Sequence, residues 1–312
     1  MVLELIRADG VLLRRDAIAA GYDDKQLYRL VAAREIVRIR HGAYAATQTW
    51  SALDDGGRHG MLSSAVVRQY DDDIALSHGS AVLRLAGPVH GLDLANVHIS
   101  HLDNRSGRRN VAGVVHHKGD TRVMDVTRLD GCWTTSPART VIDVVLMYGF
   151  EVGVVVADDF LHRGLTTKAE LWQLYEHMKH WPGALVVRLV IGFADGDSES
   201  VGESLGRLLF RRLGLPIPEL QFQVRRPDGS VAGRTDWAWP QHRTLGEFDG
   251  MEKYTRWLRP GESPTDAVLR EKRREDELRE LTGWTLIRLV WGDLFRIEQT
   301  ARRLQIVFAR AA

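Results

Sequence analysis

The sequence predicts a multidomain protein of mixed α+β and α/β structure. Three observations support this fold class. The chain has 312 residues, which is too long for one ordinary domain. Hydrophobic residues make up 44% of it, enough to build buried cores and too many for a disordered chain. Helical periodicity also alternates with short strand patterns along the chain. We expect domains at 1–46, 74–190 and 196–312, with a linker at 47–73.

Charge and cysteine content limit the class of protein. The chain carries 42 basic and 41 acidic residues, a net charge of +1, so any footprint for nucleic acid must be local. The single cysteine, Cys132, excludes an intramolecular disulfide and fits a reducing cytoplasm. The most apolar stretch, residues 141–161, contains four acidic residues, which a membrane span tolerates poorly. We therefore expect a cytoplasmic protein with no membrane partner.

The first 46 residues show three short helical patterns followed by a hairpin. The helices begin at Leu3, at Arg14 and after a cap at Asp23 or Asp24. Residues 35–40 then alternate apolar and basic side chains, and a turn and a second short strand follow. Three helices and a hairpin predict a winged helix-turn-helix.

This arrangement would present basic side chains to duplex DNA. The third helix would offer Lys25, Gln26 and Arg29 to a major groove. The wing would offer its basic residues to phosphates, namely Arg34, Arg38, Arg40 and His41. The alternative is a solvated charged face on a helical subdomain, and the basic alternation in the wing weighs against it.

Residues 47–70 are rich in Gly, Asp and Ser and predict a linker with a short helix. Residues 74–190 predict a mixed domain, with helices at 76–85 and 136–148 and strands at 97–100 and 113–117. A polar loop between these strands carries three arginines that could contact phosphate. Six histidines fall in this domain without the spacing of metal ligands or a partner nucleophile, so we interpret them as structural. They are His78, His90, His98, His101, His116 and His117.

The C-terminal third contains two short strand patterns that gather carboxylates. The strands cover residues 235–239 and 244–248 and are joined by a turn at Pro240. Side chains alternate along a strand, so Glu247 and Asp249 share a face, and antiparallel pairing can bring Asp236 beside them. Carboxylates gathered in this way repel one another unless a cation lies between them, and hard divalent cations prefer oxygen ligands. The pattern predicts a metal-dependent phosphodiesterase site.

Two helices flank these strands in the sequence. The first covers 200–213 and begins with a capping box in which Glu203 occupies the third helical position. Capping and metal ligation are both open roles for Glu203. The second covers 269–281 and is highly charged, as expected of a solvated helix face with i,i+4 ion pairs. It carries Lys272, and a closing strand at 285–290 follows.

The order of these elements resembles the PD-(D/E)XK nuclease superfamily, near its very-short-patch repair endonuclease branch. The string EFDGMEKYTRWLRPGESPTDAVLREKRREDELRELTGW carries the closest likeness and is similar to an actinobacterial family with such a nuclease-like domain. The N-terminal string RRDAIAAGYDDKQLYRLVAAREIVRIRHGAYAA resembles the winged helix of AbiEi-type antitoxins. The strings LSHGSAVLRLAGP and TTSPARTVIDVV are similar to the middle region of the same proteins.

The nuclease resemblance implies a role for individual residues. Asp236 takes the first acidic position and Glu247 the second, with Mg2+ or Mn2+ as cofactor. The superfamily has a lysine two residues after the second acid, and Asp249 stands there instead. Lys253 or Lys272 could supply the missing positive charge, or Asp249 could help to hold a second ion.

Two functions follow from these interpretations. The first is a DNA-binding endonuclease in which Asp236, Glu247, Asp249 and Glu203 hold the metal. The second is an AbiEi-like antitoxin and transcriptional regulator with a catalytically inactive nuclease-like domain, a cognate toxin and homodimeric assembly. A third, simpler interpretation leaves the carboxylates as surface residues, although unpaired acids beside two tryptophans would be costly.

Overall fold

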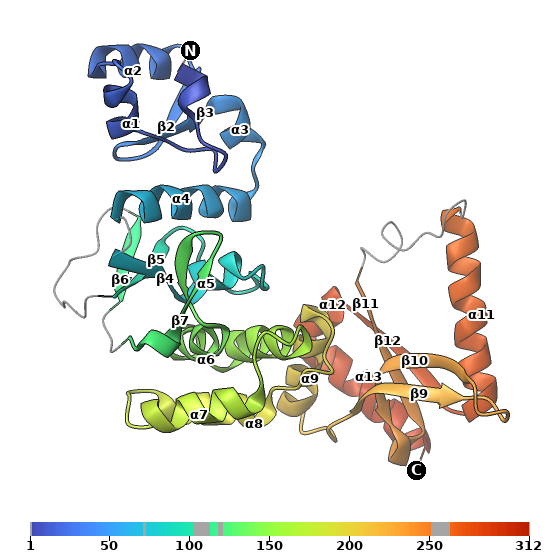
Figure 1. The fold of residues 1–312 in the computed structure, drawn as a ribbon. Helices are drawn as coiled ribbons and strands as arrows, with labels where there is room; N and C mark the ends of the chain where they lie inside the picture. Colours follow the sequence, from blue (N-terminus) through green and yellow to red (C-terminus); the bar gives the residue numbers. More distant parts are fainter. Residues whose placement is uncertain (1, 71–72, 103–112, 118–120, 251–262, 312) are drawn as a thin grey trace. The chain divides into compact units, whose positions relative to one another are not determined.

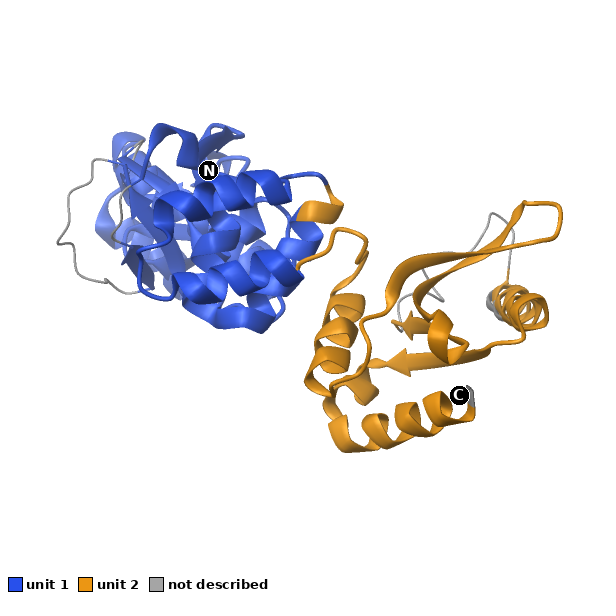
Figure 2. Cartoon of the chain, turned by 90° about the horizontal axis from the view of Figure 1, so that it is seen from below, with its two compact units in different colours: residues 1–160, 164–193 blue, residues 161–163, 194–312 orange. Residues whose placement is uncertain are grey.

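The chain folds into two compact units of mixed α and β structure. The computed structural model describes residues 2–70, 73–102, 113–117, 121–250 and 263–311. Unit 1 comprises residues 1–160 and 164–193, and unit 2 comprises residues 161–163 and 194–312 (Figure 2). Among the described residues, unit 1 contains a three-stranded and a five-stranded sheet, and unit 2 contains a four-stranded sheet.

The N-terminal part of unit 1 is a small sheet with short helices (Figure 1). Its elements are η1 (Val2–Leu5), β1 (Leu12–Leu13), α1 (Arg14–Ala19), α2 (Asp24–Ala32), β2 (Ile36–Arg40) and β3 (Ala43–Ala46), with strand order β1-β3-β2. Asp23 is the cap of α2, one of the two predicted candidates, and it forms a reciprocal capping box with Gln26. The predicted first helix is only the single 3-10 turn η1. The side chain of Asp9 accepts a hydrogen bond from the backbone of Val11 and so favours a turn over a longer helix.

Residues 47–70, which we expected to be a linker with a short helix, form two helices. These are α3 (Thr47–Ala52) and α4 (Asp55–Tyr70). Met61 and Ala65 of α4 pack with the core of the N-terminal sheet, and Val66 packs with the core of the next sheet. Arg68 of α4 also donates to the backbone oxygen of Val11 at 2.8 Å. The helix is therefore a shared core element of unit 1.

The five-stranded sheet follows α4 in the order β6-β5-β4-β8-β7. Its elements are β4 (Ile74–Leu76), α5 (His78–Arg84), β5 (Val97–His101), β6 (Val114–His117), η3 (Val123–Asp125), β7 (Val126–Leu129) and β8 (Cys132–Thr135). The strands β5 and β6 confirm the two predicted in this region. The arginine-rich loop between them lies outside the described residues.

Unit 1 ends with the helices α6 (Pro137–His162, whose last residues belong to unit 2), α7 (Lys168–Met178) and α8 (Ala184–Phe193). By length and composition, α6 is the one described helix apolar enough to cross a membrane, and 61% of its apolar window is buried within the protein. Gly149 interrupts it with φ 82° and ψ −164°, where only glycine is comfortable. A mostly buried and interrupted helix has the character of a core helix.

Unit 2 is a four-stranded sheet with helices on both faces (Figure 1). The strand order is β12-β11-β10-β9, and only β11 and β12 run parallel. The elements are α9 (Val201–Arg212), β9 (Glu219–Arg225), β10 (Val231–Trp239), η4 (Pro240–His242), β11 (Thr244–Asp249), α11 (Pro264–Thr282), β12 (Thr285–Val290), α12 (Trp291–Phe295) and α13 (Ile297–Ala311). These confirm the predicted strands, the turn at Pro240 and both flanking helices.

The two faces of this sheet have different cores. Trp237 and Trp239 point to one face and pack with Phe210 of α9 and with residues of α12 and α13. On the other face Ala238 and Leu278 of α11 belong to a second core.

Candidate functional site

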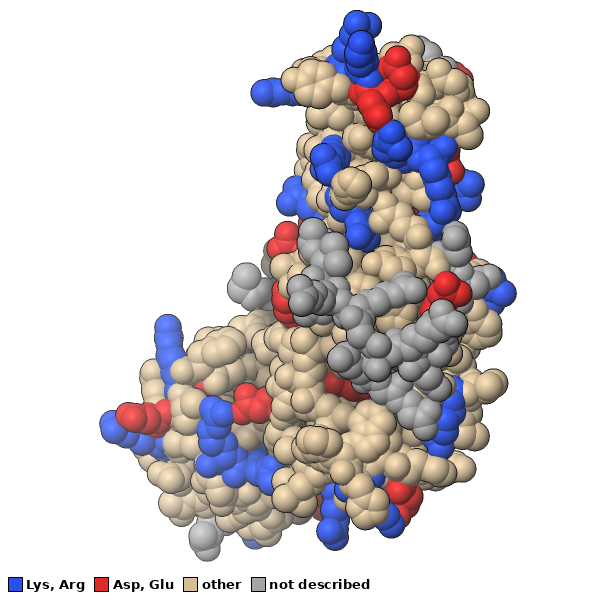
Figure 3. Space-filling view, turned by 90° about the vertical axis from the view of Figure 1, so that its left-hand side faces the viewer, with Lys and Arg blue, Asp and Glu red and all other residues tan. Residues whose placement is uncertain are grey.

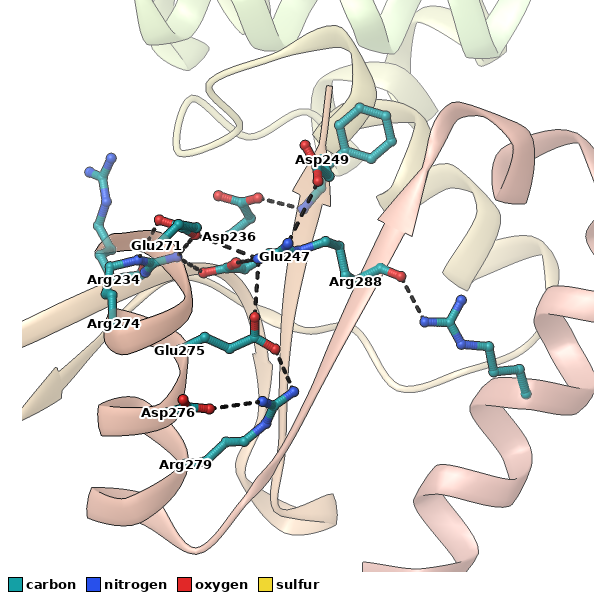
Figure 4. Close-up of polar contacts among 12 residues, drawn as sticks. Arg234, Asp236, Glu247, Asp249, Glu271, Arg274, Glu275, Asp276, Arg279 and Arg288 are labelled. Atoms are coloured by element: carbon teal, nitrogen blue, oxygen red, sulfur yellow. Dashed lines mark hydrogen bonds and ion pairs between the residues drawn. The ribbon is translucent and has the colours of Figure 1, made fainter. Parts of the chain in front are cut away.

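Acidic side chains of β10 and β11 gather on the face of the sheet that α11 covers. Asp236 directly precedes Trp237, whose ring packs on the opposite face, and its side chain lines a pocket together with residues of α11. Asp236, Glu247 and Asp249 together line a pocket of about 290 Å³. The predicted association of these three carboxylates is present in the structure (Figure 4).

Asp236 lies where the pairing of β10 with β11 stops. The regular ladder runs from Trp239 and Thr244 to Trp237 and Gly246. One residue further, the Oδ2 atom of Asp236 accepts a hydrogen bond from the backbone N–H of Phe248 at 2.7 Å. The carboxylate thus replaces a backbone acceptor and holds the end of β11 in place.

Arg288 brings a positive charge to the two acids of β11. The parallel register places it directly beside Glu247. Its guanidinium nitrogens lie 3.4 Å from Glu247 Oε2 and 3.7 Å from Asp249 Oδ2. The same guanidinium is 3.6 Å from Glu271 and 3.3 Å from Glu275, both on α11. Arg288 therefore lies at the centre of four carboxylates.

Arg274 of α11 approaches Glu247 from the other side. Its Nη2 atom donates to Glu247 Oε1 at 2.5 Å and to Glu271 Oε1 at 2.6 Å. Its Nη1 atom donates to the backbone oxygen of Arg234 at 3.3 Å. Burial alone lowers the pKa of Arg274, but the hydrogen bond to Glu271 and the charge of Glu247 outweigh it and raise that pKa above its ordinary value. The guanidinium is held firmly in its charged form.

Glu203 is a buried carboxylate at the start of α9. It accepts hydrogen bonds from the backbone of Glu199 at 3.0 Å, from Ser200 Oγ at 2.8 Å and from Gln221 Nε2 at 3.0 Å. Ser200 caps the helix through the backbone N–H of Glu203. Burial, together with the charge of Asp236, raises the pKa of Glu203 to about 7. These contacts support a capping role for Glu203, although it accepts from the backbone of Glu199 and not from that of Ser200 as the predicted capping box requires.

Neither predicted lysine lines the described pocket. Lys272 is exposed on α11, whereas Ala267, Glu271 and Arg274 of the same helix face the pocket. Lys253 lies outside the described residues. Among the described residues, Arg274 and Arg288 bring positive charge to Glu247, and neither was a predicted site residue.

The carboxylates as arranged do not fit the Mg2+ or Mn2+ ion expected from the sequence. Within the described ranges, no three His, Cys, Asp or Glu side chains are placed to hold a metal ion. Both oxygens of Glu247 contact guanidinium groups, and Asp249 pairs with one of them. Glu203 already accepts three hydrogen bonds. The acids are near one another, but their lone pairs are directed to other partners.

The predicted DNA-facing residues lie on the surface of the N-terminal part of unit 1, with exceptions. Lys25 and Arg29 are exposed on α2, and Arg34, Arg38 and His41 are exposed around the β2–β3 hairpin. Figure 3 shows Lys and Arg side chains over this upper part of one face, with some acidic residues among them. The predicted basic side chains therefore remain accessible to a partner.

Arg40 and Gln26 differ from the predicted arrangement. A register shift between Arg38 and Arg40 in the β2–β3 pairing breaks the alternation, so Arg40 is partly buried rather than exposed. Its Nε and Nη1 atoms are buried and have no hydrogen-bond partner among the described residues, and burial lowers its pKa. Gln26 is exposed, but its side-chain oxygen accepts from the backbone of Asp23. Its amide is thus partly engaged in capping α2.

The histidines of the middle region pack against one another. His98 Nδ1 lies 2.8 Å from His117 Nε2, and the ring of His78 stacks on that of His117 with centroids 3.5 Å apart. A second pair joins His101 and His116 at 2.8 Å. Burial is the main cause that lowers the pKa of His78 and His117 to about 3 and that of His98 to about 4. These imidazoles are neutral at physiological pH.

Residues 1–47 match the family described as "Transcriptional regulator, AbiEi antitoxin". The match covers the small sheet and helices that carry the exposed basic residues. The N-terminus is therefore a domain of the AbiEi antitoxin class of transcriptional regulators.

Two relatives extend the similarity beyond this domain. They are the uncharacterized protein MT2308 of Mycobacterium tuberculosis (strain CDC 1551 / Oshkosh) and the uncharacterized protein Rv2248 of Mycobacterium tuberculosis (strain ATCC 25618 / H37Rv). Each is 30% identical over 263 residues, which is 84% of this chain and 88% of the relative. The chain belongs to the same family as these two mycobacterial proteins.

Proposed function

We propose that this protein is a DNA-binding transcriptional regulator of the antitoxin type. The observation that carries the proposal is the AbiEi antitoxin match over residues 1–47, on a domain whose exposed side chains include the basic residues predicted to face DNA. In this proposal the domain is a winged helix-turn-helix. The helix α2 enters a major groove with Lys25 and Arg29, and the β2–β3 hairpin contacts phosphates with Arg34 and Arg38.

The antitoxin class also supports a toxin as protein partner, and the operator-binding form would be a homodimer on a two-fold symmetric site. Within this proposal the C-terminal unit has the PD-(D/E)XK-like order of elements but acts in binding rather than in cleavage. The arginine contacts of Glu247 support an inactive nuclease-like domain, because they occupy the carboxylate oxygens.

DNA binding is tested by gel shift with the DNA upstream of the protein's own gene, over a range of salt concentrations. We expect Arg38→Ala to weaken binding and to reduce the slope of log K against log salt by about one, because one phosphate contact is lost. Lys168→Ala is the matched control, since Lys168 is an exposed basic residue at the start of α7. Equal binding by wild type and Arg38→Ala at all salt concentrations would contradict the proposed wing contact.

Cleavage of phosphodiester bonds with Mg2+ or Mn2+ is the second candidate function. The observation that favours it is the gathering of Asp236, Glu247 and Asp249 in one pocket. The test is nicking of supercoiled plasmid with either ion. Activity that Asp236→Ala and Glu247→Ala abolish would establish it. Nicking that survives both substitutions would show a contaminating nuclease.

A further inference from the structure

The pocket of unit 2 gathers negative charge around partly buried side chains. Glu247, Asp249, Glu271 and Glu275 all lie within 4 Å of one guanidinium, that of Arg288. The side chain of Glu247 is only 8% exposed. Buried carboxylates are costly unless a positive group compensates for the lost hydration. In a metal-dependent enzyme, that group is a divalent cation.

Here each oxygen of Glu247 already has its own cationic partner. Oε1 accepts from Arg274 of α11, and Oε2 contacts Arg288 of β12. Contacts of this kind are charge-assisted and stronger than neutral hydrogen bonds. An arginine does not lose its proton in a protein, so both partners are permanent cations. A metal ion at Glu247 would have to displace a guanidinium and then remain beside another one.

We propose that Arg274 and Arg288 take the place of a divalent cation beside Glu247, so that side chains of unit 2 supply the positive charge that a metal ion would bring. The two arginines come from α11 and β12, and Glu247 lies on β11 between them. The ion pairs therefore also attach α11 to the sheet. This inference concerns unit 2 alone and does not depend on DNA binding by residues 1–47.

The direction in which Glu247→Gln shifts the melting temperature distinguishes this proposal from a metal site. In an empty metal site the acids repel one another, so Glu247→Gln removes a repulsive charge and raises the melting temperature without metal. In the proposed site Glu247→Gln removes the buried carboxylate charge that Arg274 and Arg288 both contact, and so lowers the melting temperature. Glu280→Gln is the matched control, because Glu280 is an exposed acid of α11.

The measurement is thermal unfolding of the full chain in EDTA, with hydrogen exchange of peptides from β11 and α11 to identify the transition of unit 2. We expect Glu247→Gln to lower that transition by at least about 4 °C. We also expect it to speed exchange in α11, while Glu280→Gln changes neither. A higher melting temperature for Glu247→Gln would overturn the proposal, and so would an unchanged one.

A second experiment asks directly whether the arginines exclude the metal. Mn2+ is titrated into the full chain, and free Mn2+ is followed by electron paramagnetic resonance. In wild type we expect no Mn2+ binding that depends on Glu247, so wild type and Glu247→Gln should leave the same concentration of free Mn2+. The double variant Arg274→Gln, Arg288→Gln should bind Mn2+ at least about tenfold more tightly than wild type. Adding Asp236→Asn should abolish that gain.

Arg273→Gln is the control for the double variant, since Arg273 is exposed on the same helix. Wild-type binding of Mn2+ that Glu247→Gln removes would overturn the proposal. A folded double variant that gains no Mn2+ binding would also overturn it. If the double variant does not fold, the sign of the Glu247→Gln shift decides the question.

Discussion

The buried histidines predict that unit 1 loses stability steeply between pH 6.5 and 5.5. His78, His98 and His117 contact one another, and burial lowers the pKa of each to between about 3 and about 4. In the unfolded chain their pKa is about 6.5. Between these pKa values the unfolded state therefore binds protons that the folded state does not bind. Stability is fully present well above pH 6.5 and falls as the pH drops towards the folded pKa values.

The magnitude follows from these values. Lowering the pH from 6.5 to 5.5 protonates most unfolded histidines, which favours unfolding by about 1 kcal/mol per residue. The three together give a loss of about 3 kcal/mol, a large part of a typical domain stability of about 5–15 kcal/mol. Burial raises the pKa of the neighbouring Asp143, so a proton taken up there offsets part of the loss at still lower pH.

The assay is urea unfolding of the full chain at pH 7.5, 6.5 and 5.5, followed by circular dichroism. His117→Gln should reduce the loss between pH 6.5 and 5.5 by about 1 kcal/mol, because the unfolded variant binds one proton fewer. His180→Gln is the control, since His180 is exposed in the same unit. A loss below about 1 kcal/mol in wild type would refute the reasoning, as would a loss that His117→Gln leaves unchanged.

Three further predictions concern packing and backbone geometry. Gly206→Ala should destabilise unit 2 by about 1–3 kcal/mol, because its Cβ would lie 2.4 Å from a ring carbon of Trp237; a urea midpoint at or above that of wild type would contradict this. Gly149→Ala should cost about 1–3 kcal/mol through backbone strain at φ 82°, measured by calorimetry, and an unchanged melting temperature would count against it. Arg139→Ala should cost about 3–5 kcal/mol, because its Nε atom donates to the buried Asp143 at 2.8 Å; urea unfolding with wild-type stability would exclude this contribution.

Local patterns were sufficient to predict much of unit 2. Alternation along a strand places Glu247 and Asp249 on one face, and both contact Arg288. The proline signal at Pro240 located the turn between β10 and β11. The caps at Ser200 and at Asp23, one of two candidates for the second, were also predicted, because such caps involve residues only three positions apart.

The rotation of the charged helix α11 could not be predicted in this way. Lys272 and Arg274 are both basic, but two residues turn a helix by about 200°, so they point to nearly opposite sides. Only the docking of Leu278 against the sheet decides that Arg274 faces the carboxylates and Lys272 faces solvent. A helix with charges all round carries no apolar stripe from which its orientation can be inferred.

The wing shows the same limit on a smaller scale. Strict alternation would place Arg38 and Arg40 on one exposed face. The register shift in the β2–β3 pairing breaks this alternation, and the side chain of Arg40 is partly buried. A bulge depends on the partner strand and on what packs beneath it, so the sequence of one strand does not reveal it.

The sequence by itself determined the mixed fold class, the regulator-like N-terminal pattern and the presence of three acids near the ends of two strands. Those features depend on periodicity and on spacings of a few residues. The tertiary structure alone decided which cation meets those acids. Glu247 lies 27 residues from Arg274 and 41 from Arg288, and no short-range pattern relates side chains that far apart. Their contact arises from the parallel pairing of β11 with β12 and from the packing of α11 across the sheet.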